Sequence, residues 1–427
     1  MKRIKPGLAI LALLLSILPA AALADQLEEA RAAYENNDYA KAFEILLPLA
    51  EKGDDEARTR IGVMFATGKG VAQDYVQAMK WYRLAADKGF ALAQERVGIM
   101  YELGQGVDRD YGQAITWYRL AAEQGEAGIQ YHLGTHYYDG LGIAHDYAEA
   151  AKWYRLAAEQ GHADAQHNLA YMYDNGRGVA KDHAEAIRWC RLAAENGLSS
   201  AEFNLGLMYD EGKCIRQNFA EAVKWYRLAA EQGHVKAQYN LGVLYYNGRG
   251  VPQNFAEAAR FYMLAAEQGD MDSQNDLGEM YASGKGVEKN ADEAVKWFRM
   301  AAEQGDTFAQ INLGLIFYQG LGVARDYEEA FKWFRMAAEQ GDIDAQNKLG
   351  MMYYDGRGVA QNCAEAAKWL RNAAEQGLDV SQTMLGVIYE DGEGVAQDYA
   401  EAAKWSLSTK LCNWFFSSNG HPAFKDN

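Results

Sequence analysis

Residues 146–161 read DYAEAAKWYRLAAEQG, and this stretch returns in recognisable form ten times along the chain. Its tryptophan belongs to a ladder with a constant spacing of 36 residues, on which Phe261 replaces the one missing tryptophan. The members of the ladder are Trp81, Trp117, Trp153, Trp189, Trp225, Trp297, Trp333, Trp369 and Trp405. A fixed period of this length is typical of a stack of identical supersecondary units, because one such unit cannot bury its own apolar face. The sequence therefore predicts a solenoid.

The composition favours an all-α chain. Proline is scarce, with 5 residues in 427, and the good helix formers alanine, glutamate and leucine are abundant. A solenoid gains length without gaining separate cores, so we expect one elongated domain rather than two or three globular ones.

Residues 1–24 stand outside the repeat and have the features of a secretory signal peptide. A basic start is followed by an apolar run over residues 8–18 and by the small-residue site Ala22-Leu23-Ala24. The run is short for a spanning helix, which needs about 20 residues, so a retained membrane anchor is the weaker alternative. We expect cleavage after Ala24 and a periplasmic or secreted protein.

Without residues 1–24 the chain has 39 basic and 59 acidic residues, a net charge of −20. Such an acidic protein repels phosphate backbones and anionic lipid. This charge argues against nucleic acid as a partner.

The remaining chain divides into three parts. Residues 25–53 predict a capping hairpin with helices over residues 27–35 and 39–51. Residues 54–413 hold ten 36-residue repeats, the last one degenerate. Residues 414–427 form a tail, in which Trp414, Phe415 and Phe416 are expected to cover the end of the stack, because an uncapped solenoid exposes apolar surface.

The second helix of each repeat has a start and a stop signal. In residues 146–161 Asp146 is the expected N-cap and Glu149 its reciprocal capping-box partner, and Gly161 supplies the positive φ that ends the helix. The apolar positions at helical spacing are Ala150, Trp153, Tyr154 and Ala157, and Lys152, Arg155 and Glu159 are expected on the outer, solvated face.

The first helix of each repeat carries a glycine, such as Gly242, in its interior. Glycine costs about 1 kcal/mol relative to alanine there, so its return in nine repeats predicts a close approach by a neighbouring helix. Ala170 is the one substitution. The Gly-Xaa-Gly loop that follows, such as residues 248–250, predicts a structural turn rather than a phosphate cradle, because the longer fingerprint and the preceding strand are absent.

These motifs resemble the tetratricopeptide superfamily. The two extra residues per repeat and the Gly-Xaa-Gly loop are similar to its Sel-one-like repeat branch, and the match runs from residue 54 to about residue 405. The resemblance implies a right-handed superhelix of antiparallel helix pairs that acts as an adaptor for protein complexes. Some exported relatives bind or slowly hydrolyse β-lactams, but they carry a cysteine pair in each repeat, which this chain lacks.

If the first helices line the concave face, as the resemblance implies, their outward positions form a candidate groove for a basic or extended polypeptide. These positions differ between repeats, as recognition residues do, and they are aromatic or acidic. The alternative is a solvated inner face with tyrosines packed between repeats. The aromatic members are Tyr131, Tyr138, Tyr171, Phe203, Tyr239, Tyr246, Phe308, Tyr318 and Tyr354. The polar members are Glu102, Asp139, His167, Asp174, Asp210, Glu211, Glu279, Asp355 and Glu390.

Two further patterns suggest chemistry only weakly. His132 and His136 lie four residues apart, a spacing that suits one metal ion, but sister repeats carry methionine or leucine at the second position, which favours a packed histidine. Cys190 and Cys363 replace tyrosines of sister repeats and are expected to be buried, and a bridge between Cys190 and Cys214 is left open.

No serine or cysteine recurs beside a base, so we predict no catalytic residues, metal or cofactor. The sequence predicts a non-catalytic scaffold that binds a polypeptide, as a monomer or weak oligomer. A weak β-lactam or cell-wall amide hydrolase and a cell-wall glycan binder are the alternatives.

Overall fold

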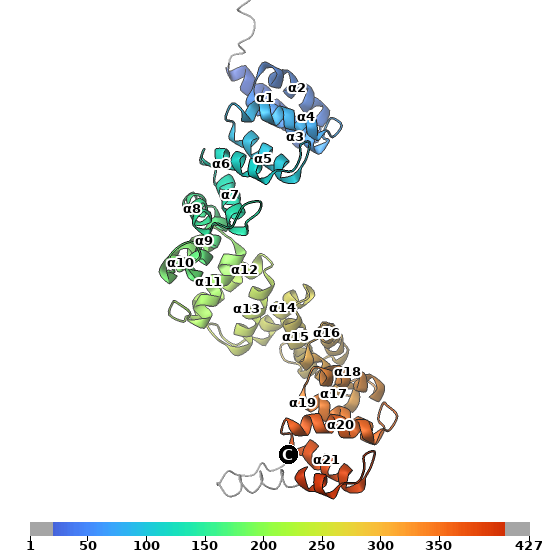
Figure 1. The fold of residues 1–427 in the computed structure, drawn as a ribbon. Coiled ribbons are helices and arrows are strands. Elements are labelled where there is room, and N and C mark those ends of the chain that lie inside the picture. Colours follow the sequence, from blue (N-terminus) through green and yellow to red (C-terminus); the bar gives the residue numbers. More distant parts are fainter. Residues whose placement is uncertain (1–19, 406–427) are drawn as a thin grey trace, which may run out of the picture. The chain divides into compact units, whose positions relative to one another are not determined.

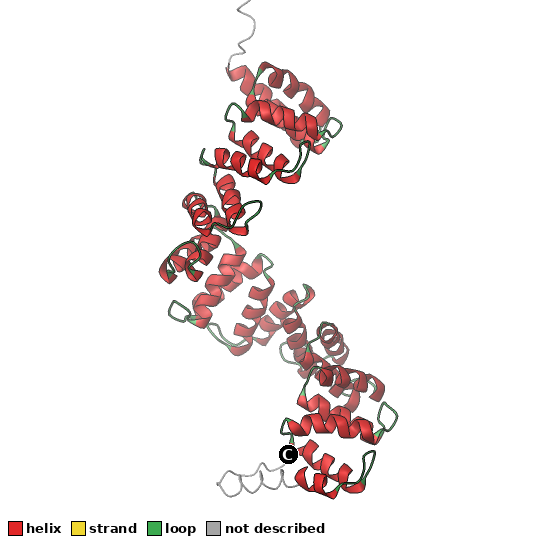
Figure 2. Cartoon of the chain, viewed as in Figure 1, coloured by secondary structure: helices red, strands yellow, loops and turns green. Residues whose placement is uncertain are grey.

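The computed structural model describes residues 20–405, and these residues form helices and short connecting loops without any strand (Figure 2). Most of the predicted signal peptide, Cys412 and the aromatic residues 414–416 of the tail lie outside the described residues. The contacts of the chain group into two units, residues 1–205 and residues 206–427, and each unit is described by itself.

In the first unit consecutive helices pack as hairpins (Figure 1). They are α1 (Ala20–Glu35), α2 (Tyr39–Lys52), α3 (Asp55–Thr67), α4 (Tyr75–Ala86), α5 (Ala91–Leu103), α6 (Tyr111–Ala122), α7 (Ala127–Asp139), α8 (Tyr147–Glu159), α9 (Ala163–Asn175) and α10 (His183–Glu195). The next helix, α11 (Ser199–Glu211), begins in this unit and ends in the second.

The second unit repeats the same order. Its helices are α12 (Phe219–Glu231), α13 (Val235–Asn247), α14 (Phe255–Glu267), α15 (Met271–Ser283), α16 (Ala291–Glu303), α17 (Thr307–Gln319), α18 (Tyr327–Glu339), α19 (Ile343–Asp355), α20 (Cys363–Glu375) and α21 (Asp379–Asp391), and residues 399–405 are again helical. The predicted all-α solenoid of helical hairpins is therefore confirmed.

The hairpin that precedes the repeats starts earlier than expected. α1 begins at Ala20 rather than near residue 27, so the predicted cleavage site after Ala24 lies inside this helix in the uncleaved chain. α2 begins where the Asp38 carboxylate accepts from the backbone N–H of Lys41, and Gly53 ends it with φ 104°.

The second helices begin at the predicted caps, but the reciprocal bond of the capping box is not formed. The Asp146 carboxylate accepts from the backbone N–H groups of Ala148 and Glu149, each at 3.0 Å. The Glu149 carboxylate instead accepts from Lys152 at 3.3 Å. The backbone N–H of Asp146 donates to the Tyr137 carbonyl at 2.9 Å, because the first helix of the same repeat offers a buried acceptor there.

The apolar stripe of α8 is buried as predicted, with Trp153 and Tyr154 at 6% and 1% exposure. Arg155 departs from the prediction, since it is half-buried rather than solvated. Its guanidinium donates to the hydroxyl of Tyr173 in the next repeat at 2.6 Å. Second-helix arginines therefore join successive repeats.

The interior glycines of the first helices lie against aromatic rings, as their sequence pattern predicts. A Cβ added to Gly134 would lie 2.7 Å from the Tyr154 ring. In the next repeat Ala170 replaces the glycine, and Cys190 replaces the tyrosine that would face it. The two exceptions therefore compensate each other, since the smaller cysteine leaves room for the alanine methyl group.

The second glycine of each loop has a positive φ and packs against the preceding repeat. A Cβ on Gly250, which has φ 74°, would lie 2.4 Å from the carbonyl carbon of Phe219. The loop is a structural turn, as predicted. Cys214 occupies this position in one loop and still adopts φ 64°, a conformation that non-glycine residues rarely take.

Most first helices carry a glutamine that joins successive second helices through buried hydrogen bonds. Gln130 donates to the Ala122 carbonyl at 3.1 Å and accepts from the amide of Gln160 at 2.8 Å. The same pair of bonds recurs at Gln238, Gln274, Gln310 and Gln346. These glutamines satisfy helix C-terminal carbonyls that would otherwise be buried without a partner.

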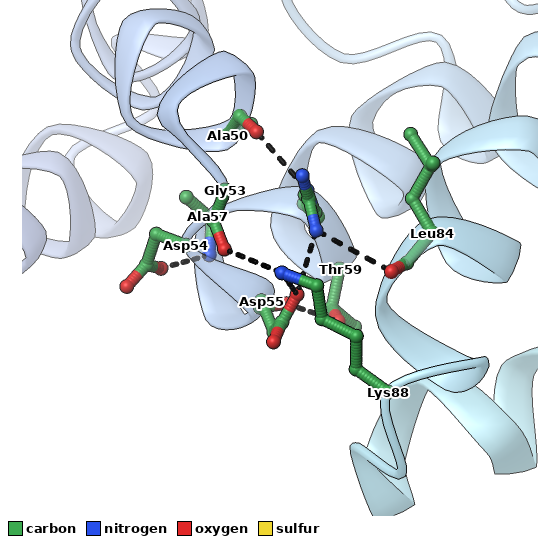
Figure 3. A network of polar contacts seen from close by, with 9 residues as sticks. Ala50, Gly53, Asp54, Asp55, Ala57, Thr59, Leu84 and Lys88 are labelled. Atoms are coloured by element: carbon green, nitrogen blue, oxygen red, sulfur yellow. Dashed lines mark hydrogen bonds and ion pairs between the residues drawn. The ribbon is translucent and has the colours of Figure 1, made fainter.

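The first repeat makes this joint with charged side chains (Figure 3). Arg58 takes the glutamine position and donates to the carbonyls of Ala50 at 3.1 Å and Leu84 at 3.4 Å. It also pairs with Asp55 at 2.9 Å, and Lys88 lies 3.5 Å from the same carboxylate. The capping hairpin is thus attached through an ion-pair network instead of an amide pair.

Candidate functional site

Four of the predicted groove residues in the first unit meet in one cavity, which we call the α7–α9 pocket. It has a volume of about 300 Å³ and lies between the two first helices and the intervening α8. Its lining consists of Tyr131, Thr135, Tyr138, Asp139, Tyr154, Asn168 and Tyr171. Among the predicted residues these are Tyr131, Tyr138, Asp139 and Tyr171.

The chain's own Arg177 lies over the tyrosines of this pocket. Its guanidinium donates to the Tyr138 hydroxyl at 2.8 Å and lies 5.6 Å from the centre of the Tyr171 ring. Across the pocket the Tyr154 hydroxyl donates to Thr135 at 3.2 Å, and burial raises the pKa of Tyr154 to about 12. The pocket is therefore a small site lined by phenol groups, with the guanidinium of Arg177 at its edge.

Three predicted residues of the second unit meet in a larger cavity of about 610 Å³, the α13–α17 pocket. Three successive first helices line it: α13 provides Tyr239 and Tyr246, α15 provides Asp276 and Glu279, and α17 provides Asn312. The second helices contribute Tyr262 and Phe298 as its floor, Lys285 follows α15, and the remaining lining is mostly apolar. Asp276 was missed by the sequence analysis.

Asp276 has the most perturbed carboxyl group of this pocket. Burial, together with the neighbouring carboxylates of Glu279 and Asp272, raises the pKa of Asp276 to about 7. Burial and the same Asp276 charge raise the pKa of Tyr239 to about 12 and that of Tyr262 further still. The pocket thus concentrates negative charge beside phenol groups.

The two pockets occupy equivalent places in their units, three repeats apart. Tyr131, Tyr138 and Tyr154 correspond to Tyr239, Tyr246 and Tyr262, and Arg177 corresponds to Lys285. The polar lining differs at four positions: Asn168 becomes Asp276, Tyr171 becomes Glu279, Asp139 becomes Asn247 and Thr135 becomes Val243. Sister repeats keep asparagine at residues 204, 240 and 312, so the aspartate is a departure from a common pattern and could have been noticed in the sequence.

Comparison with known families settles what the repeats are. The model described as "Sel1 repeat" matches ten consecutive segments: residues 55–90, 91–126, 130–162, 163–198, 199–234, 235–270, 272–306, 307–342, 343–378 and 379–408. The chain belongs to the Sel1-repeat family. Sel1-repeat solenoids are generally non-catalytic scaffolds and mediate protein–protein interaction.

Solved Sel1-repeat structures resemble the chain over most of its length. One is c5321, a protective antigen present in uropathogenic Escherichia coli strains, with 38% identity over 93% of this chain and 86% of that chain and a TM-score of 0.74. Another is a Sel1 repeat protein from Oxalobacter formigenes, with 33% identity over 74% of this chain and 93% of that chain and a TM-score of 0.57. No curated protein matches the sequence significantly.

Other predicted groove residues of the Sel1 repeats are engaged in contacts of their own. Glu102 accepts from the Tyr118 hydroxyl at 2.6 Å, and Asp174 pairs with His183 at 2.8 Å. Asp210 accepts from the Tyr226 hydroxyl at 3.1 Å, and Asp355 pairs with Arg357 at 3.3 Å. These carboxylates stabilise the repeats, and none of them lines either pocket.

The rest of the predicted groove is scattered. Tyr318 accepts a hydrogen bond from Arg357, Tyr354 is half-buried beside Glu393, and Phe203 is half-buried on α11. His167 is half-buried and burial lowers its pKa. The exposed members are Glu211, Phe308 and Glu390.

His132 and His136 face different carboxylates. His136 is buried, stacks on Tyr118 and has its Nε2 3.5 Å from Glu102, whereas His132 has its Nδ1 3.5 Å from Glu95. The prediction of a packed histidine at residue 136 is confirmed. Within residues 20–405 neither histidine belongs to a group of three close metal-ligating side chains.

The three described cysteines are free thiols, so the bridge between Cys190 and Cys214 is not formed. Cys190 is buried as predicted, and burial raises its pKa to about 12. Cys363 is only half-buried, contrary to the prediction, because it stands at the exposed first position of α20. Over the described residues no helix is long and apolar enough to cross a membrane.

Proposed function

We propose that this protein is an exported, non-catalytic Sel1-repeat scaffold that binds a polypeptide partner through first-helix side chains of its second unit. The α13–α17 pocket carries this proposal. Three successive first helices contribute variable polar residues to one cavity, while the second helices beneath supply the repeated buried aromatic residues. A cavity of this size with few convergent polar groups has the form of a binding site.

The charge of the pocket indicates the nature of the partner. Asp276 and Glu279 lie in a chain whose net charge is strongly negative. Complementary charge favours a basic polypeptide, because it speeds encounter and penalises acidic competitors. A glycan is the alternative occupant, and its binding would not depend on these charges.

The export of the protein rests on residues 1–24, whose pattern is that of a signal peptide. The description of the Escherichia coli relative as a protective antigen is compatible with export. N-terminal sequencing of the protein from the cell envelope or medium is expected to begin at Asp25. A chain that still begins at Met1 and remains in the cytoplasm would contradict this part of the proposal.

Affinity capture from envelope fractions tests the binding role. The bait is the mature chain, and the variant is Glu279→Lys, which reverses one exposed charge of the pocket. The matched control is Glu303→Lys, an exposed charge at the end of α16. We expect the first variant to lose the partner and the control to keep it. Equal recovery with both would contradict the assignment of the pocket.

A hydrolase would need an activated nucleophile. The buried Cys190 thiol has a pKa raised to about 12, so it is protonated at neutral pH and is a poor nucleophile. We expect the purified protein to leave a chromogenic β-lactam intact. Hydrolysis that a point mutation abolishes would support the enzyme instead of the scaffold.

A further inference from the structure

The carboxylates of the α13–α17 pocket differ from the other acidic groups around them in having no basic partner. On α13 Lys236 pairs with Asp270 at 2.8 Å and with Asp272 at 3.5 Å, and Arg299 pairs with Glu329 at 2.9 Å. In the part of the chain that the structure describes, no ion pair is formed by Asp276 or Glu279. The pocket therefore holds two acidic groups without an ion-pair partner, and only hydrogen bonds with Tyr262 and Asn275 favour the charged form of Asp276.

Lys285 is the basic residue of the lining, and it is directed to a phenol. Its ammonium group donates to the Tyr246 hydroxyl at 3.2 Å and lies 5.6 Å from the centre of that ring. In the equivalent α7–α9 pocket Arg177 makes the same kind of contacts with Tyr138. The repeat thus already places cations against tyrosines, while Lys285 forms no ion pair with the carboxylates of α15.

A buried carboxylate without a counter-charge is costly, because desolvation penalises its charged form. A neutral occupant would leave that cost in place, whereas a cation would offset it and could also stack on the tyrosine rings. Guanidinium suits such a site better than ammonium, since it is planar, weakly hydrated and able to bond two carboxylates in a fork.

We propose that the α13–α17 pocket binds an arginine side chain of the polypeptide partner, held between the Asp276 and Glu279 carboxylates and the Tyr239 and Tyr246 rings. This inference rests on the proposed function and gives it a specific recognition element. A volume of about 610 Å³ accommodates the side chain together with part of the neighbouring backbone.

The site binds the cation in a pH-dependent way. The groups facing Asp276 are Glu279 and Asp272 from α15, Tyr239 from α13, Tyr262 from α14 and Asn312 from α17, with Lys285 at the edge. Because the pKa of Asp276 is raised to about 7, this carboxyl loses its proton near neutral pH. Affinity for arginine therefore rises between about pH 6 and pH 8, and binding releases a proton.

Ligand-observed NMR with the full chain tests the inference. The probe is the peptide acetyl-Gly-Arg-Gly-amide, and its matched control contains citrulline, which has nearly the same shape but no charge. We expect the arginine peptide to bind at least tenfold more tightly than the citrulline peptide at about pH 8, and the difference to shrink at about pH 6. Equal affinity for the two peptides would overturn the inference.

Variants localise the binding. Asp276→Asn is expected to weaken binding of the arginine peptide at least fivefold and to flatten its pH dependence. The variant should fold, since asparagine stands at the equivalent residues 168, 204, 240 and 312. Glu303→Gln on α16 is expected to change nothing. Unchanged affinity in Asp276→Asn would overturn the inference, as would tighter binding of a neutral wall oligosaccharide in the same pocket. If capture of the partner is still lost in Glu279→Lys while arginine and citrulline bind alike, the scaffold proposal stands and only the arginine inference fails.

Discussion

The α7–α9 pocket and the α13–α17 pocket share the positions of three tyrosines, yet only the second contains two carboxylates from one helix. Asn168 and Tyr171 in the first pocket become Asp276 and Glu279 in the second. The second cavity also has about twice the volume, at about 610 Å³ against about 300 Å³. Replacing a tyrosine ring by the slimmer glutamate is consistent with this opening.

The comparison shows how a repeat scaffold can carry a specific site. Glycine contacts, glutamine bonds and helix caps recur in both units because they hold the stack together. Side chains that face the pockets are free of this requirement and can change between repeats. A few changes such as Asn168 to Asp276 and Tyr171 to Glu279 can therefore turn a structural pocket into a recognition site, at the expense of a half-buried charge.

The largest effect is expected at the glycines that pack against Tyr154 and Tyr262, one tyrosine of each pocket. A Cβ on Gly134 or on Gly242 would lie 2.7 Å from the ring of Tyr154 or Tyr262. Gly134→Val and Gly242→Val should each lower the free energy of unfolding by ~3 kcal/mol, because the added side chain would overlap the ring and force the two helices apart. Urea unfolding followed by circular dichroism measures this. A large cost at one glycine and none at the other would show that the two pockets do not share a scaffold.

The next largest effect concerns the half-buried Asp276 carboxyl group of the second pocket. The raised pKa means that the folded protein holds the Asp276 proton more tightly than the unfolded chain, whose carboxyl titrates near pH 3.9. The resulting stabilisation is complete below the unfolded pKa and is lost as the pH rises to about 7.

Asp276→Asn removes this dependence, so it should raise the free energy of unfolding by ~2 kcal/mol at about pH 8, since one pKa unit corresponds to ~1.4 kcal/mol and solvent access reduces the full effect. At about pH 5 the gain should be small. The mirror variant Asn168→Asp should destabilise the first pocket at about pH 8. Urea titrations at the two pH values decide the point, and a pH-independent gain in Asp276→Asn would contradict the assigned pKa.

A smaller effect, equal in both units, is expected at the buried glutamines. Gln130 and Gln238 each donate to a helix C-terminal carbonyl and accept from a glutamine one repeat on. Gln130→Met and Gln238→Met keep the volume but leave these groups without partners, which should cost ~1–2 kcal/mol each. Hydrogen exchange of the adjoining helix ends measures the loss. No change in exchange would show that water replaces the amide.

The smallest effect is expected for the basic residues at the pocket edges. Arg177 and Lys285 are exposed and each donates to a tyrosine hydroxyl. Arg177→Gln and Lys285→Gln should change the free energy of unfolding by less than ~1 kcal/mol, because exposed charge contacts are screened by water. Thermal melts of both variants test this. A loss of several degrees in one variant alone would mean that its cation is a structural part of that pocket.

Most of the fold can be predicted from the sequence because the repeats can be compared with one another. Ten copies show which positions tolerate no change, and from them the helix caps, the close-packed glycines and the loop turns can be predicted. The predicted reciprocal hydrogen bond of Glu149 is not formed, because the backbone N–H of Asp146 donates to the carbonyl of Tyr137 instead. Local sequence does not encode this contact between helices.

The candidate site is only partly predictable. Outward tyrosines and carboxylates can be identified from variation between repeats, but whether they meet depends on side-chain packing. Asp210 illustrates this, since its carboxylate turns to the Tyr226 hydroxyl instead of a pocket. Asp276 was missed because it lies one turn before Glu279 at a position that asparagine usually holds. Its importance comes from burial without a counter-charge, which only the structure shows.

The central claim is that the Asp276 and Glu279 carboxylates distinguish the recognition pocket from its structural counterpart. The most direct test measures binding of the arginine peptide at about pH 8 to the double variant Asp276→Asn with Glu279→Tyr, which replaces the two carboxylates by the side chains that stand at these positions in the first pocket. The matched control, Asn168→Gln with Tyr171→Phe, alters the α7–α9 pocket without adding charge. We predict that the first variant loses binding while the second binds as the unmodified protein does. Binding that survives in the first variant, or that disappears in the second, would contradict the account.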